Sequence, residues 1–306
     1  MTISEPEDLG TPAPYQVDVV HEDEVPSETV EKKTLGFGFW LAIGWIVLIV
    51  GAAILAPVLP IKDPNKNFIQ TGERPPYGLS WEHLMGTDQD ARDMFSRTIF
   101  GARVSLTVGF SAIAFGMLIG GSLGMIAGFV RGWFDRVISF LFLVLLSFPA
   151  LVLAILITAL VDRSLFTISL TLGLLAIAPV GRLSRAATLV FAEREFVMAA
   201  RTIGAKQSRI LLRELLPNVL IPMSALALLG VAVAIVAEGG LAFLGLSVES
   251  GSTWGKLILT GSGTRTLEDS PWVAFGPIIV LFLTVMALNF AGDRLRDYFD
   301  VKELAV

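Results

Sequence analysis

Few residue types that could carry covalent, redox or metal chemistry occur in this sequence of 306 residues. It contains no cysteine, which excludes disulfides, thiolate nucleophiles, iron–sulfur clusters and thiolate zinc sites. Its two histidines, His21 and His83, fall outside every long apolar run, so paired haem ligands inside a membrane and the HExxH metal motif are excluded. The sequence therefore predicts no catalytic residue and no metal site.

A nucleotide-binding loop is also missing. The stretch nearest to the G-x-x-x-x-G-K-[ST] pattern is 251–257, which has one residue too few between its glycines and no hydroxyl after Lys256. Because such loops cradle phosphates with backbone N–H groups, the spacing is essential. Any ATP must be handled by another polypeptide.

Isolated polar residues inside long apolar runs are the remaining candidates for a site. Glu238 is the only carboxylate at such a position, and an ionisable residue at membrane depth is a functional hypothesis by default. Glu238 could line a solute path, or it could cap backbone amides at a helix break formed by Gly239 and Gly240. Asn289 is either a path residue or, in the favoured interpretation, an interhelical hydrogen-bonding group. Ser147 has no intramembrane histidine or lysine to activate it, which argues against an intramembrane enzyme.

The composition requires a lipid environment for the elements that carry these residues. The chain is 54% apolar and 17% charged, whereas about a quarter of the residues of a soluble domain are charged. A bilayer-crossing helix needs about 20 residues. Runs of that length occur at 37–59, 104–130, 137–160, 167–190, 219–245 and 272–291. We therefore predict an all-α integral membrane protein with six transmembrane helices in one membrane domain.

The distribution of basic residues predicts that both termini lie on the cytoplasmic side. Short cytoplasmic loops retain Lys and Arg. With both ends inside, most of the 23 basic residues lie inside. Most of the others lie in or beside the long 60–103 loop, which weighs little in this rule. The opposite orientation is the less favoured alternative.

The chain divides into segments of different character. Acidic residues and prolines dominate the N-terminal segment, which cannot bury enough apolar surface to fold. Within the long loop, apolar residues of 87–103 recur on one helical face, which predicts a short interfacial helix. The predicted segments are a disordered acidic cytoplasmic tail at 1–34, a first transmembrane helix at 35–60, an extracytoplasmic loop with the interfacial helix at 61–103, a membrane core at 104–297 and a cytoplasmic tail at 298–306.

Glycine and proline mark special positions inside the predicted spans. The second span carries a glycine at every fourth position: Gly116, Gly120, Gly124 and Gly128. This spacing leaves one helix face without side chains, so another backbone can approach closely, either in ordinary helix packing or at a path or subunit seam. Pro149 and Pro179 lie inside the third and fourth spans and predict kinks, in a moving pore helix or as static bends.

Residues 191–217, between the fourth and fifth spans, are too polar to cross lipid. The stretch 195–203 indicates a short helix with the small residues Ala199 and Ala200. Gly204 permits a turn, because glycine accepts positive φ. A second amphipathic helix follows and is predicted to end at Pro217. Two short helices would form a compact cytoplasmic knob; composition alone equally allows a solvated loop whose basic face lies on anionic lipid.

This segment resembles the EAA loop of bacterial ATP-binding-cassette (ABC) importer permeases. The resemblance rests on the pattern of Ala199, Ala200, Gly204, Leu216 and Pro217. In that family the loop is a coupling helix that docks into a cleft of the ATPase subunit. The resemblance implies an ATPase-coupling role for Glu195, Phe196, Ala199, Ala200, Arg201, Gly204, Ala205, Ile210, Leu216 and Pro217.

The likeness extends over about 80–301 and points to the branch that handles dipeptides, oligopeptides, nickel and glutathione. It is carried by 85–93, 96–97, 101–106, 238–246, 254–255, 271–272 and 288–297. The chain most resembles the smaller permease of the dipeptide type. It departs from the pattern at Met198, where a glutamate is usual, at Glu214, where histidine is frequent, and at Ala91, where glycine is usual. The first departure places coupling on backbone shape and small-residue packing rather than on one carboxylate.

The resemblance implies the remaining features as expectations. The fold is that of a type I ABC importer permease in the bacterial cytoplasmic (inner) membrane. The partners are a second permease in a heterodimer, two ABC ATPase subunits, an extracytoplasmic substrate-binding protein and membrane lipid, with no nucleic acid. The chain itself is non-catalytic and holds no cofactor; ATP and Mg²⁺ bind the ATPases. For Glu238 the resemblance favours the helix-break cap.

The solute is predicted to be a peptide, and haem, a nickel chelate or glutathione are alternatives within the same importer class. Bare nickel is less favoured, because no histidine or cysteine lies in a span. A secondary transporter driven by ions is a distant alternative. It would require inverted repeats and more intramembrane carboxylates than Glu238 alone.

Overall fold

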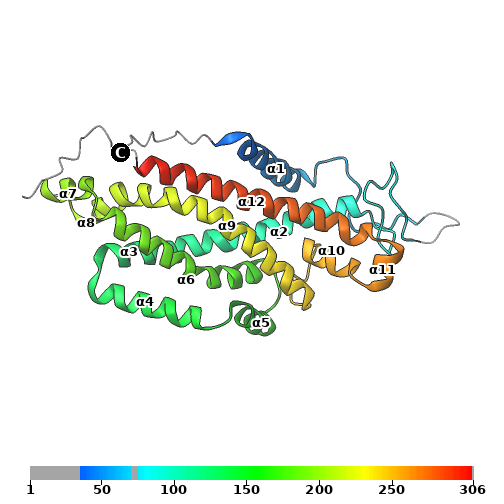
Figure 1. Ribbon diagram of the computed structural model, residues 1–306. Coiled ribbons are helices and arrows are strands. Elements are labelled where there is room, and N and C mark those ends of the chain that lie inside the picture. The colour runs from blue at the N-terminus through cyan, green and yellow to red at the C-terminus, as the bar shows by residue number, and fades with distance from the viewer. Residues whose placement is uncertain (1–34, 70–74, 305–306) are drawn as a thin grey trace, which may run out of the picture.

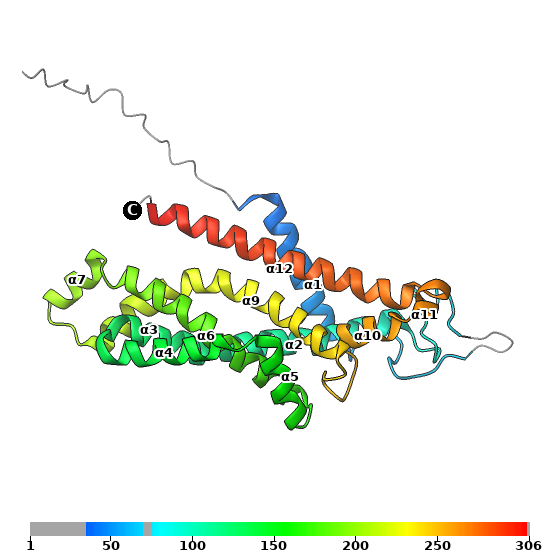
Figure 2. The ribbon, with the colours of Figure 1, turned by 60° about the horizontal axis from the view of Figure 1, so that its bottom comes forward.

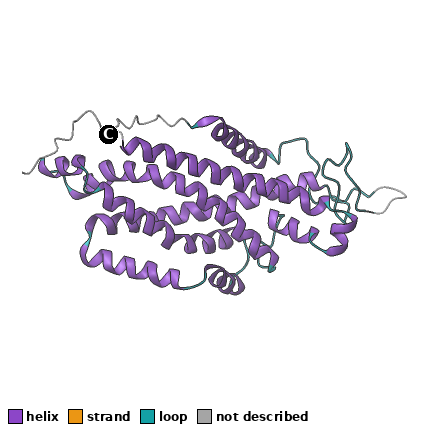
Figure 3. Cartoon of the chain, viewed as in Figure 1, coloured by secondary structure: helices purple, strands orange, loops and turns teal. Residues whose placement is uncertain are grey.

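The computed structural model describes residues 35–69 and 75–304. The predicted acidic tail at 1–34 lies outside the described residues. Helices make up most of the described chain, and its longest loop lies at one end of the molecule (Figure 3). The elements, labelled in Figure 1, are α1 (Gly36–Leu55), α2 (Met94–Gly116), the π-helical turn η2 (Met117–Gly121), α3 (Ser122–Val130), α4 (Gly132–Ser147), α5 (Ala150–Leu160), α6 (Leu165–Phe191), α7 (Glu195–Thr202), α8 (Gln207–Arg209), the π-helical turn η3 (Ile210–Leu215), α9 (Leu216–Phe243), α10 (Trp254–Gly261), α11 (Thr264–Asp269) and α12 (Trp272–Leu304).

Five helical stretches of the described chain are long and apolar enough to cross a membrane, and the number is six when the bent pair α4–α5 is counted as one broken span. The all-α, six-span prediction is thereby confirmed. The pair α4–α5 is bent by 83° at Phe148 and Pro149, and α5 projects away from the bundle in Figure 2. The predicted kink at Pro149 is confirmed. Helix α6, in contrast, continues without a break through Pro179.

The long helices run side by side, with α7 and α8 at one end and α10, α11 and the long loop at the other (Figure 1). Helix α2 packs against α6 and α9, and α12 packs against α9 and α1. The largest apolar cluster lies between these helices and includes the fully buried residues Ala102, Ile168, Ile235, Leu241 and Trp254. Helix α12 continues to Leu304, through most of the predicted C-terminal tail.

The four-residue glycine repeat lies against α6. A Cβ added at Gly120 would meet the carbonyl oxygen of Ile177 at 2.2 Å, and one at Gly124 would meet that of Gly181 at 2.0 Å. At the other two glycines of the repeat, Gly116 and Gly128, an added Cβ would also meet α6, at 2.7 and 2.8 Å. No side chain fits between the two backbones, so this face is a helix-packing contact within the chain.

The second span begins earlier than the sequence predicts. Helix α2 starts at Met94 and continues into the span, so the predicted helix within 87–103 is present only from Met94 on and is the first part of α2. The carboxylate of Asp93 caps this start by accepting a hydrogen bond from the backbone N–H of Ser96 at 2.8 Å. Ser96 and Arg97 in the first turn of α2 donate hydrogen bonds to the Lys62 carbonyl and to Asp88 in the long loop. The polar start of α2 is therefore satisfied without a break in the helix.

Candidate functional site

Residues 192–215, called the elbow below, protrude from the end of the bundle opposite α10 and α11 (Figures 1 and 2). The elbow contains α7, the turn at Gly204, α8 and η3. It is joined directly to the two long helices α6 and α9. A displacement of the elbow therefore acts on both.

The turn after α7 depends on glycine. Gly204 has φ +79°, a conformation that glycine adopts without the steric penalty of a Cβ. The backbone N–H of Ala205 donates to the carbonyl of Ala200 at 3.0 Å, and that of Gly204 donates to the carbonyl of Arg201 at 3.0 Å. This pair of hydrogen bonds is the Schellman motif that ends a helix at a left-handed residue. The turn therefore requires glycine at position 204, whereas Ala200 and Arg201 contribute only their backbone carbonyls.

Helix α7 has one buried and one exposed face. Val197 is fully buried and Ala200 is largely buried in an apolar cluster with residues of α9, η3 and the end of α3. The exposed apolar side chains of α7 and its C-cap are Ile203, 85% exposed, Met198, 52%, and Phe196, 37%. Apolar side chains gathered at a protruding helix are typical of a protein contact surface.

The predicted coupling residues, in α7 and in the segment after it, differ in exposure. Those exposed are Glu195, Phe196, Ala199, Arg201, Gly204 and Pro217; Ala205 and Leu216 are half-buried, and Ala200 and Ile210 are buried. The prediction that the second short helix ends at Pro217 is wrong, because residues 207–243 form one continuous helix. Pro217 directly follows the π-helical turn η3, where the regular i→i−4 hydrogen-bond pattern is already interrupted.

A hollow of about 650 Å³ adjoins the elbow. Phe129 and Arg131 line one side of it, and Met198, Arg201 and Gln207 line another. The hollow separates part of the elbow from the turn between α3 and α4. The elbow is therefore packed less completely than the middle of the bundle.

Glu238 lies in an unbroken helix. Helix α9 continues through Gly239 and Gly240 to Phe243, so the predicted helix break and its capping by Glu238 are wrong. The Glu238 side chain is fully buried and accepts hydrogen bonds from the hydroxyls of Ser247, at 2.5 Å, and Ser105, at 3.5 Å. The carboxylate therefore links α9 to α2 and to the segment before α10.

Gly255 permits the close approach of α10 to α9. A Cβ added at Gly255 of α10 would lie 2.6 Å from the Cα of Gly239. Trp254 fixes α10 on α2 as well, because its backbone N–H donates to Ser105 Oγ at 3.1 Å and its indole donates to the Thr98 carbonyl at 3.0 Å. At Gly239 and Gly240 themselves an added Cβ would make only ordinary contacts, at 4.0 and 3.9 Å.

Asn289 is half-buried on α12. Among the described residues its side chain has no hydrogen-bond partner, so the predicted interhelical hydrogen bond is not seen. The alternative role, a path residue, stays a prediction.

Residues 120–303 match a family model described as a binding-protein-dependent transport system inner membrane component. The chain belongs to this family. It is 35% identical over 263 residues to the dipeptide transport system permease protein DppC of Alkalihalophilus pseudofirmus, and the match covers 86% of both chains. It is 34% identical over 258 residues to the oligopeptide transport system permease protein OppC of Bacillus subtilis, covering 84% of this chain and 83% of that protein.

Two further comparisons extend this result. The chain is 32% identical over 259 residues to the glutathione transport system permease protein GsiD of Pectobacterium atrosepticum, covering 84% of this chain and 85% of that protein. An inward-facing structure of the MetNI methionine ABC transporter matches with a TM-score of 0.55 and 20% identity, over 67% of this chain and 97% of that chain. The predicted type I permease fold, the resemblance to ABC importer permeases and the assignment as a multi-pass inner membrane protein are confirmed.

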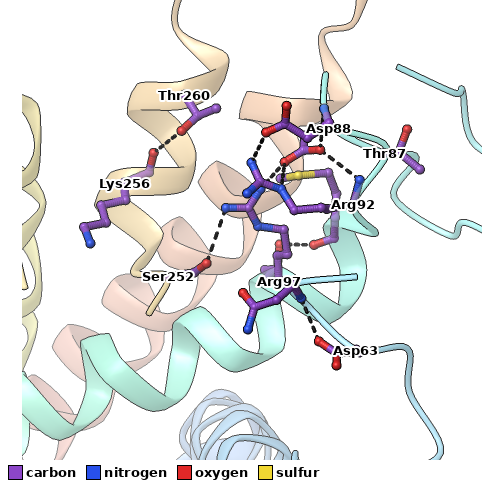
Figure 4. A network of polar contacts seen from close by, with 12 residues as sticks. Asp63, Thr87, Asp88, Arg92, Arg97, Ser252, Lys256 and Thr260 are labelled. Atoms are coloured by element: carbon purple, nitrogen blue, oxygen red, sulfur yellow. Dashed lines mark hydrogen bonds and ion pairs between the residues drawn. The ribbon is translucent and has the colours of Figure 1, made fainter. Parts of the chain in front are cut away.

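In this permease the end opposite the elbow holds a polar network that sequence reasoning did not identify as a site (Figure 4). Asp88 is 1% exposed and accepts a hydrogen bond from Arg92 Nε at 2.8 Å and an ion-pair hydrogen bond from Arg97. Arg97 also donates to Ser252 Oγ at 3.5 Å. The network joins the long loop, α2 and the segment before α10. A hint was available, since Asp88 lies in the 85–93 motif.

Three more details belong to the same end. The buried imidazole of His83 lies 2.8 Å from the Asp93 carboxylate that caps α2. Ala91, at the position where the resemblance leads us to expect glycine, has φ 58°. Lys256 donates to the carbonyls of Glu249 and Gly251. Burial lowers the pKa of Lys256 below its ordinary value, although the nearby acidic residues oppose that shift.

Proposed function

We propose that this chain is the non-catalytic permease subunit of an ABC importer that moves peptides of the dipeptide or oligopeptide class across the cytoplasmic membrane. The observation that carries the proposal is the elbow. Its outer face presents apolar side chains beyond the end of the bundle, and its buried face is anchored to both α6 and α9. A partner that pushes on α7 therefore moves two spans at once.

The energy comes from partner chains in this proposal. Two ATPase subunits bind ATP and Mg²⁺ and receive α7 in a cleft. Closure of the ATPases displaces the elbow, and the spans attached to it open the path alternately to each side. No bond is broken in this chain, whose role is mechanical.

The remaining partners occupy other surfaces. A second permease completes the path, and apolar side chains exposed along α4 and α5 face it or membrane lipid. An extracytoplasmic binding protein delivers the solute to the end formed by α10, α11 and the long loop. Both termini lie in the cytoplasm, since the elbow end carries a dense group of basic residues: Arg194, Arg201, Lys206, Arg209 and Arg213.

The choice of peptides follows from relatives named for dipeptide and oligopeptide transport. Glutathione is the second candidate, because a relative of nearly equal identity is named for its transport. A binding assay with the cognate binding protein, dipeptides, oligopeptides and glutathione decides between them. Haem and nickel chelates are tested in the same assay.

The experiment that tests the function is ATP hydrolysis by the complex copurified through a tag on this chain and reconstituted in liposomes. Ala199→Trp and Gly204→Val should abolish stimulation by solute-loaded binding protein or detach the ATPases, because one blocks docking and the other cannot adopt positive φ. Ala199→Ser and Gly204→Asn are matched controls that keep small size and tolerate left-handed φ. If the chain purifies alone and moves solute without ATP, it is instead an ion-driven secondary transporter.

A further inference from the structure

The turn between α3 and α4, residues 129–132, has an unusual backbone. Arg131 has φ 60° and ψ −161°, and Gly132 follows with φ 65°. That combination of positive φ and extended ψ is populated almost only by glycine. A non-glycine residue persists there when the surrounding structure holds it, and such positions gather at functional sites.

The side chain of Arg131 reaches the elbow. Its Nη2 lies 2.7 Å from Glu193 Oε1, at the joint between α6 and α7. Both partners are exposed, Arg131 by 49% and Glu193 by 72%, and exposed ion pairs contribute little to stability. The pair therefore does not compensate for an unfavourable backbone, which indicates a role other than holding the fold.

Two further contacts join the same turn to the elbow. The guanidinium of Arg201 in α7 lies over the ring of Phe129, 5.6 Å from its centroid, within the range of a cation–π interaction. Phe129 itself is largely buried in the apolar cluster that contains Val197 and Ile210. A hollow of about 650 Å³ lies beside these contacts, so the turn meets the elbow through the ring of Phe129 on one side and through the exposed Arg131–Glu193 pair on the other.

The turn leads to spans that are not joined to the elbow along the chain and otherwise meet it only through their packing on α6. Helix α3 continues from α2 through η2 and packs along α6. Helix α4 begins immediately after the turn. A movement passed to residues 129–132 therefore reaches two more spans, α2–α3 and the one that begins with α4.

We propose that Arg131 is a positioning residue that transmits movement of the elbow to the α3–α4 turn. ATPase closure then displaces α2–α3 and α4 together with α6 and α9. Arg131 acts through Glu193 and contacts neither nucleotide nor solute. This inference rests on the proposed coupling function of the elbow.

The first test is Arg131→Gly in the complete reconstituted complex. Glycine removes the side chain and suits the backbone, so assembly and melting temperature should be unchanged or higher. The ratio of solute-stimulated to basal ATP hydrolysis should fall about two- to fivefold, the range that corresponds to the loss of one exposed ion pair. If the turn needs only its backbone conformation, the Arg131→Gly complex will keep the wild-type ratio. That result overturns the proposal.

Charge exchange provides the second test. Arg131→Glu and Glu193→Arg should each lower the ratio, and the double variant should restore most of it. A double variant as impaired as the single variants overturns the proposal. Gly204→Val is measured in parallel: if it uncouples the complex while Arg131→Gly does not, the inference fails and the coupling function stands. If neither changes ATP hydrolysis and the ATPases do not copurify, the proposed function itself is wrong.

Discussion

The two ends of the bundle are built differently. Around α10, buried polar side chains join separate parts of the chain: Glu238 links α9 to α2, Trp254 links α10 to α2, and Asp88 links the long loop to α2. At the elbow, the contacts are a small apolar cluster and exposed charged side chains beside a hollow. This difference indicates a fixed end that preserves its shape and an adjustable end where movement enters.

The largest effect is expected at the fixed end. Trp254→Ala should lower stability by about 4 kcal/mol, because it removes a fully buried side chain and its hydrogen bond to Thr98. Thermal unfolding of the purified chain in detergent measures the change. Trp133→Ala is the matched control, since Trp133 is 71% exposed. Equal melting temperatures for the two variants would contradict the rigid character of this end.

The next effect is expected at Glu238. Glu238→Leu should cost about 2–3 kcal/mol, because it leaves the buried hydroxyls of Ser247 and Ser105 without their acceptor. Glu238→Gln retains an acceptor and should lose less than half as much. The same detergent unfolding assay gives both values. A Gln variant that is fully stable but does not transport would instead place Glu238 on the solute path.

At the adjustable end, the effect should fall on binding rather than on folding. Ile203→Asp changes a side chain that is 85% exposed and should alter stability by less than about 0.5 kcal/mol. Attachment of the ATPases should weaken by about 1–2 kcal/mol if Ile203 is part of a buried contact. Copurification at increasing salt and detergent, with Ile203→Val as control, measures this. Intact attachment of the Asp variant would exclude the outer face of α7 as the contact.

The smallest effect sharpens the description of the fixed end. Ala91→Gly should stabilise the chain by about 0.5 kcal/mol, since relief of the left-handed conformation outweighs the greater freedom of glycine in the unfolded state. The melting temperature should rise slightly. A decrease would mean that packing of the fully buried Ala91 methyl group outweighs backbone strain.

The sequence predicts what depends on local pattern. Apolar runs predict the spans, Pro149 predicts the bend, and the spacing of Ala200 and Gly204 predicts the turn of the elbow. It does not predict that Ser105 and Glu238, 133 positions apart, share a hydrogen bond, because no local pattern records which helices become neighbours. It also misplaces the start of α2 and the end of the second elbow helix. Asp93 caps the start of α2, and the π-helical turn η3 lets the second helix continue through Pro217. Both depend on three-dimensional geometry, which composition does not record.

The most direct test of the central claim uses the absence of cysteine from the chain. Ile203→Cys is labelled with a membrane-impermeant maleimide in inside-out and right-side-out vesicles, and Trp81→Cys, at a position 96% exposed in the long loop, is the reference for the opposite end. We predict labelling of the Ile203 variant only in inside-out vesicles, and protection when the ATPases are bound. Labelling in right-side-out vesicles, or labelling that is unaffected by the ATPases, would contradict the role of the elbow as the coupling element.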